Sequence, residues 1–234
     1  MEITKREIIA SISILAIMLI IGFYISGKIS EHHQDENSIY NKAMKIKQQD
    51  IFEYSMKTNV GNAFVEGELI ALNPVTYDKL KGEYLYIKRV KERYTMHTRV
   101  VKSGKSTRVQ TYWTWDYIGK EDKISDRLSF LGVNFNSDKF NIPDGDYIDT
   151  ISGGFRLRSK YYGYPIKSNV TIFGSLKDNT IKDQANVYES NINDTIENLQ
   201  NSGVFELSIF WLVWIGVAIT IIFLFYKAEN KWLE

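Results

Sequence analysis

Three aspartates crowd a short segment in the second half of the chain: Asp144, Asp146 and Asp149. Carboxylate oxygens at this spacing could ligate calcium, and a pair such as Asp144 and Asp146 could supply the acid and the base of a hydrolase. The segment lacks the other positions of a complete calcium-binding loop, and most acidic loops are solvated turns. We therefore favour a solvated turn here and keep calcium binding and hydrolysis as alternatives.

The second chemically distinctive feature is an aromatic stripe formed by Trp113, Trp115 and Tyr117. These residues alternate, so in a strand they would share one face. Such a stripe could be an exposed platform for a partner or a ligand. Because the alternation is in step with the strand pattern, it favours packing into a core.

Other chemistries find no support in the composition. The chain has no cysteine, which excludes disulfides, Cys-ligated zinc and iron–sulfur clusters. Its histidines, His32, His33 and His97, are poorly spaced for a metal, so we expect surface roles for them. Neither a Gly-x-Ser-x-Gly elbow nor an HExxH motif occurs, and the net charge of +1 gives no electrostatic case for nucleic acid. We predict no enzyme, no metal site and no cofactor.

The elements that would position these residues are mostly strands. Residues 83–101 and 107–118 have a period of two around a turn at 103–106, which predicts a long hairpin carrying the aromatic stripe. Gly67 suggests a bulge or a close approach in its strand. Lys177-Asp178-Asn179 predicts a second hairpin turn, and a short helix is expected through residue 201, ended by Ser202-Gly203. The other predicted strands cover residues 60–72, 128–135, 147–151, 170–176 and 180–181.

Both ends of the chain are long apolar runs without a charge, at Ile8–Ser26 and Leu207–Tyr226. At about 1.5 Å per residue, each could cross a hydrocarbon layer about 30 Å thick. A cleaved signal peptide is the alternative for the first run, although the run is long for one and no A-x-A-like site follows. The sequence thus predicts a membrane protein in which two transmembrane helices bracket one β-rich (α+β) domain.

The basic residues that flank the apolar runs predict the orientation. Lys5 and Arg6 precede the first run, and Lys227 and Lys231 follow the second, so the positive-inside rule puts both termini in the cytoplasm. The expected segments are a cytoplasmic N-terminus (1–7), the first span (8–26), a helical stalk or flexible linker (27–59), an extracytoplasmic β-rich domain (60–204), the second span (205–226) and a cytoplasmic tail (227–234).

Several short stretches resemble a known family. The segments 62–69 and 80–92 are similar to the opening strands of the GIDE domain, and 171–181 resembles its later hairpin. The segment 191–202, which leads directly into an apolar run, also resembles that family. The GIDE domain is the beside-a-membrane domain of MULAN-type mitochondrial ubiquitin ligases. Residues 89–94 and 112–117 further resemble strands of the LUMA transmembrane family.

This resemblance implies a β domain beside a membrane that senses or scaffolds. The catalytic RING of the ligases has no counterpart, because a RING cannot be built without cysteine. We therefore expect a non-enzymatic protein of the bacterial plasma membrane whose domain binds a partner, a lipid or an envelope ligand. The bilayer, a protein partner or further copies of the chain are its expected partners. An envelope-associated hydrolase and a subunit of an oligomeric pore are the alternatives.

Overall fold

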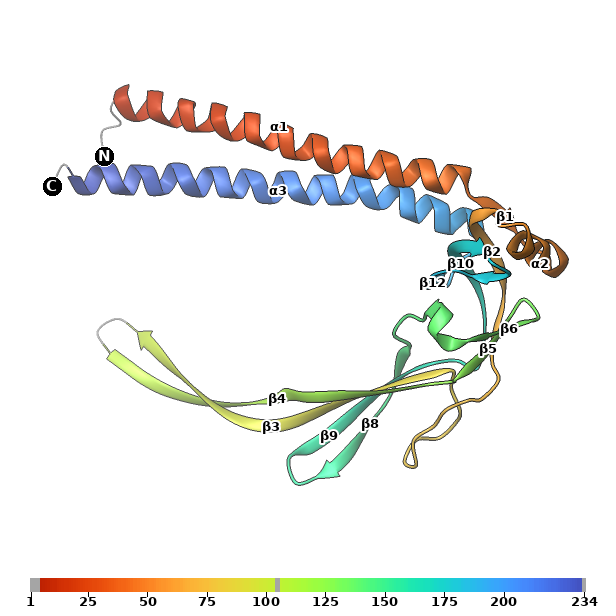
Figure 1. The fold of residues 1–234 in the computed structure, drawn as a ribbon. Helices are drawn as coiled ribbons and strands as arrows, with labels where there is room; N and C mark the ends of the chain where they lie inside the picture. The colour runs from red at the N-terminus through yellow and green to blue at the C-terminus, as the bar shows by residue number, and fades with distance from the viewer. Residues whose placement is uncertain (1–4, 104–105, 233–234) are drawn as a thin grey trace. The chain divides into compact units, whose positions relative to one another are not determined.

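The computed structural model describes residues 5–103 and 106–232, which form two compact units (Figure 1). One unit is helical and draws its described residues from 1–43 and 193–234. The other is β-rich and spans Met44–Ile192. The domain therefore begins at Met44, earlier than the expected residue 60.

The helical unit contains α1 (Lys5–Lys42) and α3 (Ile192–Trp232). Both helices are long and apolar enough to cross a membrane, judged by length and composition. Most of their large apolar side chains are exposed, including Ile20 and Leu212. The predicted layout of two long apolar helices bracketing a β-rich domain is confirmed.

The expected break at Ser202-Gly203 is wrong, because α3 continues through both residues. One glycine costs a helix only about 1 kcal/mol relative to alanine, which a long helix tolerates. Packing explains the glycine: a Cβ at Gly203 would lie 2.6 Å from Cγ of His33 on α1. The residue marks close helix contact and not a helix end.

The predicted stalk over 27–59 is helical only as far as Lys42. Strand β1 (Met44–Ile46) then pairs in parallel with β2, and helix α2 (Gln49–Lys57) follows. Ile46, Phe52 and Met56 are buried in the core of the β unit, so burial of these side chains outweighs continuation of the helix.

The first sheet of the β unit is built around β2 (Gly61–Ala71) and β10 (Lys167–Lys177), which pair antiparallel over ten residues without a register shift. Gly67 therefore sits at a close approach and not at a bulge, because a Cβ there would lie 2.7 Å from Leu131 Cδ1. The strand order is β6-β5-β2-β10-β12-β7, with β1 beside β2 and β11 beside β10. The remaining members are β5 (Arg127–Phe130), β6 (Val133–Asn136), β7 (Phe140–Asn141), β11 (Thr180–Ile181) and β12 (Ala185–Tyr188).

Two turns shape this sheet. Leu131 and Gly132 both have positive φ, so the single strand expected over 128–135 is instead the hairpin of β5 and β6. The hairpin predicted at Asp178 and Asn179 is confirmed, with φ angles of 56° and 60°. A short 3-10 helix, η1 (Ser137–Lys139), follows β6.

The largest buried cluster lies on one face of this first sheet, and Phe64 is buried against Phe173 on the other face. Phe52 of α2 meets Phe130 edge to face, with ring centroids 5.7 Å apart, and both are fully buried. Phe135 and Phe140 extend the same cluster. α2 is amphipathic, and its apolar residues close this core.

The second sheet has the order β4-β3-β9-β8. The predicted long hairpin is confirmed as β3 (Tyr86–Ser103) and β4 (Ser106–Ile124), while residues 104–105 of its expected turn lie outside the described residues. β8 (Asp146–Gly154) and β9 (Leu157–Tyr164) form the other hairpin. β9 pairs with β3 only as far as Arg93, so among the described residues the outer part of the long hairpin has two strands.

The pairing of β3 with β4 changes register between Lys91 and Glu92. These two residues lie opposite three residues of β4, namely Tyr117, Ile118 and Gly119. This extra β4 residue changes which parity faces each side of the sheet. The shift explains why β4 continues to Ile124, beyond the alternating stretch that predicted it.

Candidate binding surface on the long hairpin

Three aromatic rings stack across the two strands of the long hairpin. Tyr94 of β3 lies opposite Trp115 of β4, and the next pair on the same face is Met96 with Trp113. The Tyr94 ring is stacked on Trp113, with centroids 5.2 Å apart and planes at 22°, and lies 5.1 Å from Trp115. Cross-strand aromatic pairs of this kind stabilise a sheet by about 0.2–1 kcal/mol each.

Two arginines from the β8–β9 hairpin lie over the tryptophans. The guanidinium carbon of Arg156 is 4.3 Å from the centroid of Trp113, and that of Arg158 is 4.1 Å from Trp115. The carbonyl of Arg156 accepts a hydrogen bond of 2.9 Å from the backbone N–H of Tyr94, which aligns the two hairpins. We call Tyr94, Trp113, Trp115, Arg156 and Arg158 the aromatic–arginine ladder.

Glu92 anchors the inner end of this ladder. Its carboxylate accepts hydrogen bonds from Arg158 Nε at 2.5 Å and from Lys160 Nζ at 3.0 Å. Burial raises the pKa of Glu92, but the two cationic partners outweigh burial and hold the pKa below its ordinary value. The carboxylate therefore stays charged and fixes the Arg158 side chain over Trp115.

The favoured core interpretation of Trp113, Trp115 and Tyr117 is wrong. The two tryptophans are half-buried, Tyr117 is 62% exposed, and none of the three belongs to a buried cluster of the described residues. The alternation correctly placed them on one face. It could not show that the outer hairpin lacks a covering layer.

Two of the three aspartates of the acidic segment, Asp144 and Asp149, accept hydrogen bonds within the β unit. Lys88 Nζ donates to Asp144 Oδ2 at 2.5 Å, and the backbone N–H of Thr150 donates to Asp149 Oδ1 at 2.7 Å. Asp146 begins β8. Across residues 5–103 and 106–232, no group of three His, Cys, Asp or Glu side chains is placed to hold a metal ion. The three carboxylates are thus not gathered into one calcium site.

Within the acidic segment, the backbone of Gly145 lies directly against the backbone of Gly163. A Cβ at this position would lie 1.9 Å from the carbonyl carbon of Gly163, so only glycine permits this backbone approach. Residues 142–145 form no turn or bend, and the close approach at Gly145 instead brings the start of β8 against β9, where Asp146 pairs with Gly163.

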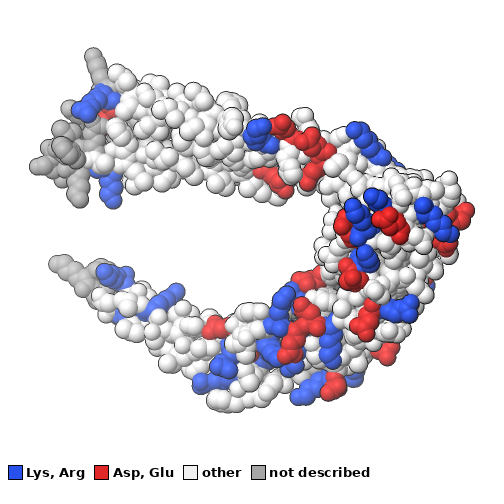
Figure 2. Space-filling model, in the orientation of Figure 1, with Lys and Arg blue, Asp and Glu red and all other residues white. Residues whose placement is uncertain are grey.

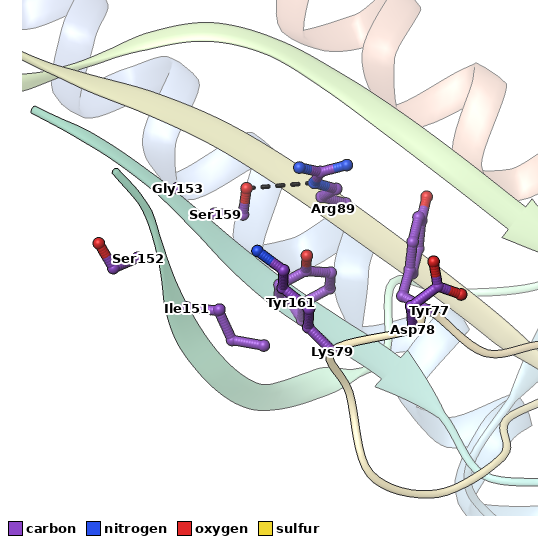
Figure 3. A pocket seen from close by; sticks show the side chains of 9 residues that line it. All are labelled: Tyr77, Asp78, Lys79, Arg89, Ile151, Ser152, Gly153, Ser159 and Tyr161. Carbon is purple, nitrogen blue, oxygen red and sulfur yellow. Dashed lines mark hydrogen bonds between the residues drawn. The ribbon is translucent and has the colours of Figure 1, made fainter. Parts of the chain in front are cut away.

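A small pocket lies on the other face of the second sheet (Figure 3). Its volume is about 160 Å³, and Arg89 Nε donates to Ser159 Oγ at 3.1 Å within it. Arginine stays protonated, so it cannot act as the base that would activate this serine. Burial, with the charge of Glu121 adding to it, raises the pKa of Tyr77. The lining residues are Tyr77, Asp78, Lys79, Arg89, Ile151, Ser152, Gly153, Ser159 and Tyr161.

Sequence reasoning missed both the arginines of the ladder and this pocket. The tryptophans and the arginines are separated by more than 40 positions, and only the pairing of β3 with β9 brings them together. The strand β9, whose segment mixes Arg, Lys, Ser and Tyr, was itself not predicted.

Each of the three histidines lies beside a carboxylate side chain. His97 Nε2 lies 2.7 Å from Asp116 Oδ2 across the hairpin, and in the helical unit His33 Nε2 lies 3.0 Å from Glu206 Oε2. His32 lies 3.6 Å from Glu36 on the same helix. His33 Nδ1 also lies 3.6 Å from Glu36 Oε2, and its side chain is only 14% exposed, so the expected surface role is wrong for His33.

Comparisons with protein-family models, with curated proteins and with solved structures found no match. The resemblance to the GIDE domain and to the LUMA family therefore rests on the sequence motifs alone and stays a prediction.

Proposed function

We propose that this chain is an integral membrane protein whose β unit is a binding module outside the cytoplasm, in a bacterial plasma membrane. α1 and α3 are its transmembrane helices, with both termini in the cytoplasm. The aromatic–arginine ladder is the surface that engages a protein partner or an envelope or lipid ligand. The module senses or scaffolds and does no chemistry of its own.

The ladder is the observation that carries this proposal. Its aromatic rings and guanidinium groups lie on an open sheet face, where they form no part of a core. Tyr, Trp and Arg are the residues most enriched at the energetic centres of binding surfaces. The ladder is also held rigid by Glu92 and by the backbone of Arg156, which lowers the entropy lost on binding.

Membrane integration is supported by the two helices. Their apolar runs are largely exposed to the surroundings, which suits lipid and not water. Extraction of membranes with alkaline carbonate tests this: the full chain is expected to stay with the lipid. Protease added to intact cells is expected to cut within residues 44–192. Release by carbonate, or protection of those residues, would contradict the proposal.

Photo-crosslinking tests the binding surface. Tyr117 is 62% exposed beside the ladder, and Tyr54 on α2 is 65% exposed elsewhere in the same unit, so the two form a matched pair. With benzoylphenylalanine at each position in turn, irradiation of intact cells should give a protein or lipid adduct at 117 and none at 54. Arg158→Gln should abolish the adduct. Equal labelling at both positions, or none at 117, would refute the assignment.

A further inference from the structure

The outer part of the long hairpin is an unsupported arm, which we define as Tyr94–Ser103 of β3 with Ser106–Asp116 of β4. Within the described residues no third strand pairs with it, because β9 ends its pairing with β3 at Arg93. A two-stranded hairpin is marginally stable in water by itself. The ladder stabilises the inner end of the arm and leaves its outer end without such support.

The outer end of the arm is apolar and exposed. Val100 and Val109 lie directly opposite each other and are 63% and 70% exposed, and Val101 on the other face is 38% exposed. Met96, on the same face as Val100, is 54% exposed. Strands that end in exposed valines on both faces present apolar surface that water solvates poorly.

The charge of the arm has one sign near these valines. No Asp or Glu occurs between Glu92 and Asp116, and Asp116 lies against His97. Figure 2 shows blue basic groups separated by white surface along the outer hairpin. Lys102 and Arg108 flank the valines, since Arg108 pairs with Val101 and Lys102 lies next to it. The basic residues of the arm are Arg99, Lys102 and Arg108.

From this arrangement we infer that the arm docks on the surface of an anionic lipid bilayer, the one that holds the chain's own helices. The valines enter the boundary between headgroups and acyl chains, and Lys102 and Arg108 contact lipid phosphates. A bilayer offers apolar and anionic groups within a few ångströms of one another, which matches this tip.

The inference rests on the proposed function, because membrane anchoring keeps the arm at high local concentration near lipid.

The absence of cysteine makes a direct test available. Val109→Cys places a single thiol on the tip, and Val60→Cys, at a valine that is 39% exposed between α2 and β2, is the matched control. Each full-length variant is labelled with an environment-sensitive fluorophore. It is then reconstituted in vesicles of phosphatidylcholine, either alone or with 30% phosphatidylglycerol as an order-of-magnitude anionic content (roughly that which gives a strong surface potential).

We expect the label at position 109 to shift to the blue and to be quenched by brominated lipid in the anionic vesicles, whereas the label at position 60 does not respond. Replacing both Lys102 and Arg108 with Gln should lower the docked-to-undocked ratio about 25-fold, about fivefold for each charge. Lys45→Gln with Lys57→Gln removes the same charge from β1 and α2 and should leave the ratio unchanged. Far-ultraviolet circular dichroism checks that the variants fold.

Two outcomes would overturn the inference. One is a label at position 109 that behaves like the label at position 60 in anionic vesicles. The other is a shift at position 109 that ignores lipid charge and disappears as protein is diluted in lipid, because a second copy would then cover the tip. Neither outcome would alter carbonate resistance or the adduct at position 117, so failure of docking is distinguishable from failure of the proposed function.

Discussion

The two sheets of the β unit are stabilised in different ways. The sheet around β2 and β10 buries a continuous cluster of aliphatic and phenylalanine side chains closed by α2. The sheet around β3 and β4 buries only a small cluster, centred on Leu80, Ile87 and Tyr161, and adds stacked rings and ion pairs at its surface. The same alternating pattern thus yields a core in one sheet and a partly exposed face in the other.

Under the proposed function, this difference would separate the residues that stabilise the unit from those that bind a partner. Substitutions in the first sheet should act mainly on unfolding, because they leave cavities. Substitutions in the ladder should act mainly on binding, because the rings there are half solvated already. The following experiments set the two sheets against each other.

The largest effect is expected in the first sheet. Phe130→Ala removes a fully buried ring that contacts Phe52 and Phe140, and should lower the free energy of unfolding by about 3–5 kcal/mol. Trp113→Ala should cost about 1 kcal/mol, since its ring is only half-buried. Thermal unfolding of the purified full chain measures both. Equal losses would mean that the ladder is part of a core.

A backbone contact in the second sheet comes next. Gly145→Ala would drive a methyl group into the backbone of Gly163, and we expect a loss of about 3 kcal/mol. Gly153→Ala is the matched control, because its nearest neighbour, Leu157 Cβ, lies at 3.3 Å. Hydrogen exchange of the β8 and β9 amides should rise in the first variant only. Unchanged exchange there would show that the backbone accommodates the methyl group while β8 and β9 stay paired.

Glu92→Gln should cost about 1.5–3 kcal/mol at neutral pH, because it breaks charged hydrogen bonds to Arg158 and Lys160 at a side chain that is 13% exposed. The pKa of Glu92 is lowered in the folded chain, so its stabilisation is complete above the ordinary carboxyl value. It is lost as the pH falls through the lowered pKa.

The difference between wild type and Glu92→Gln should therefore shrink below pH about 4. Unfolding measured at several pH values checks this. A difference in unfolding free energy that grows in acid would mean that the charged form of Glu92 does not stabilise the folded chain.

The smallest effect is the coupling between Arg158 and Trp115. A double-mutant cycle with Arg158→Gln and Trp115→Leu should give about 0.5–2 kcal/mol, the range for a cation over a partly solvated ring. Arg99 with Tyr112, at 5.7 Å, offers a weaker reference pair. A coupling of zero would reduce the ladder to a set of independent side chains.

The sequence predicted the features that rest on local patterns. The apolar runs, the long hairpin and the turn at Asp178 and Asn179 each follow from composition or from backbone preferences within a few residues. The turn predicted in the acidic segment is not found, because residues 142–145 form no turn or bend. Glycine is required at position 145 by a backbone contact with Gly163, which is distant in sequence.

Features that depend on distant partners escaped prediction. Gly203 suggested a helix end because its partner, His33, lies on another helix. Ile46 and Phe52 fall within the segment predicted as a stalk, and their burial was missed because the sheet that buries them is formed by later residues. Only the tryptophans of the ladder were recognised in the sequence. Arg158 belongs to β9, whose mixed polar sequence did not predict a strand, and Arg156 lies in the turn before it.

The tryptophan distribution gives the ladder a practical consequence. Trp113 and Trp115 are the only tryptophans between residues 44 and 192, and the other three, Trp211, Trp214 and Trp232, belong to α3. A chain with phenylalanine at those three positions would emit indole fluorescence solely from beneath Arg156 and Arg158. The fluorescence of Trp113 and Trp115 would then report directly on binding at the aromatic–arginine ladder.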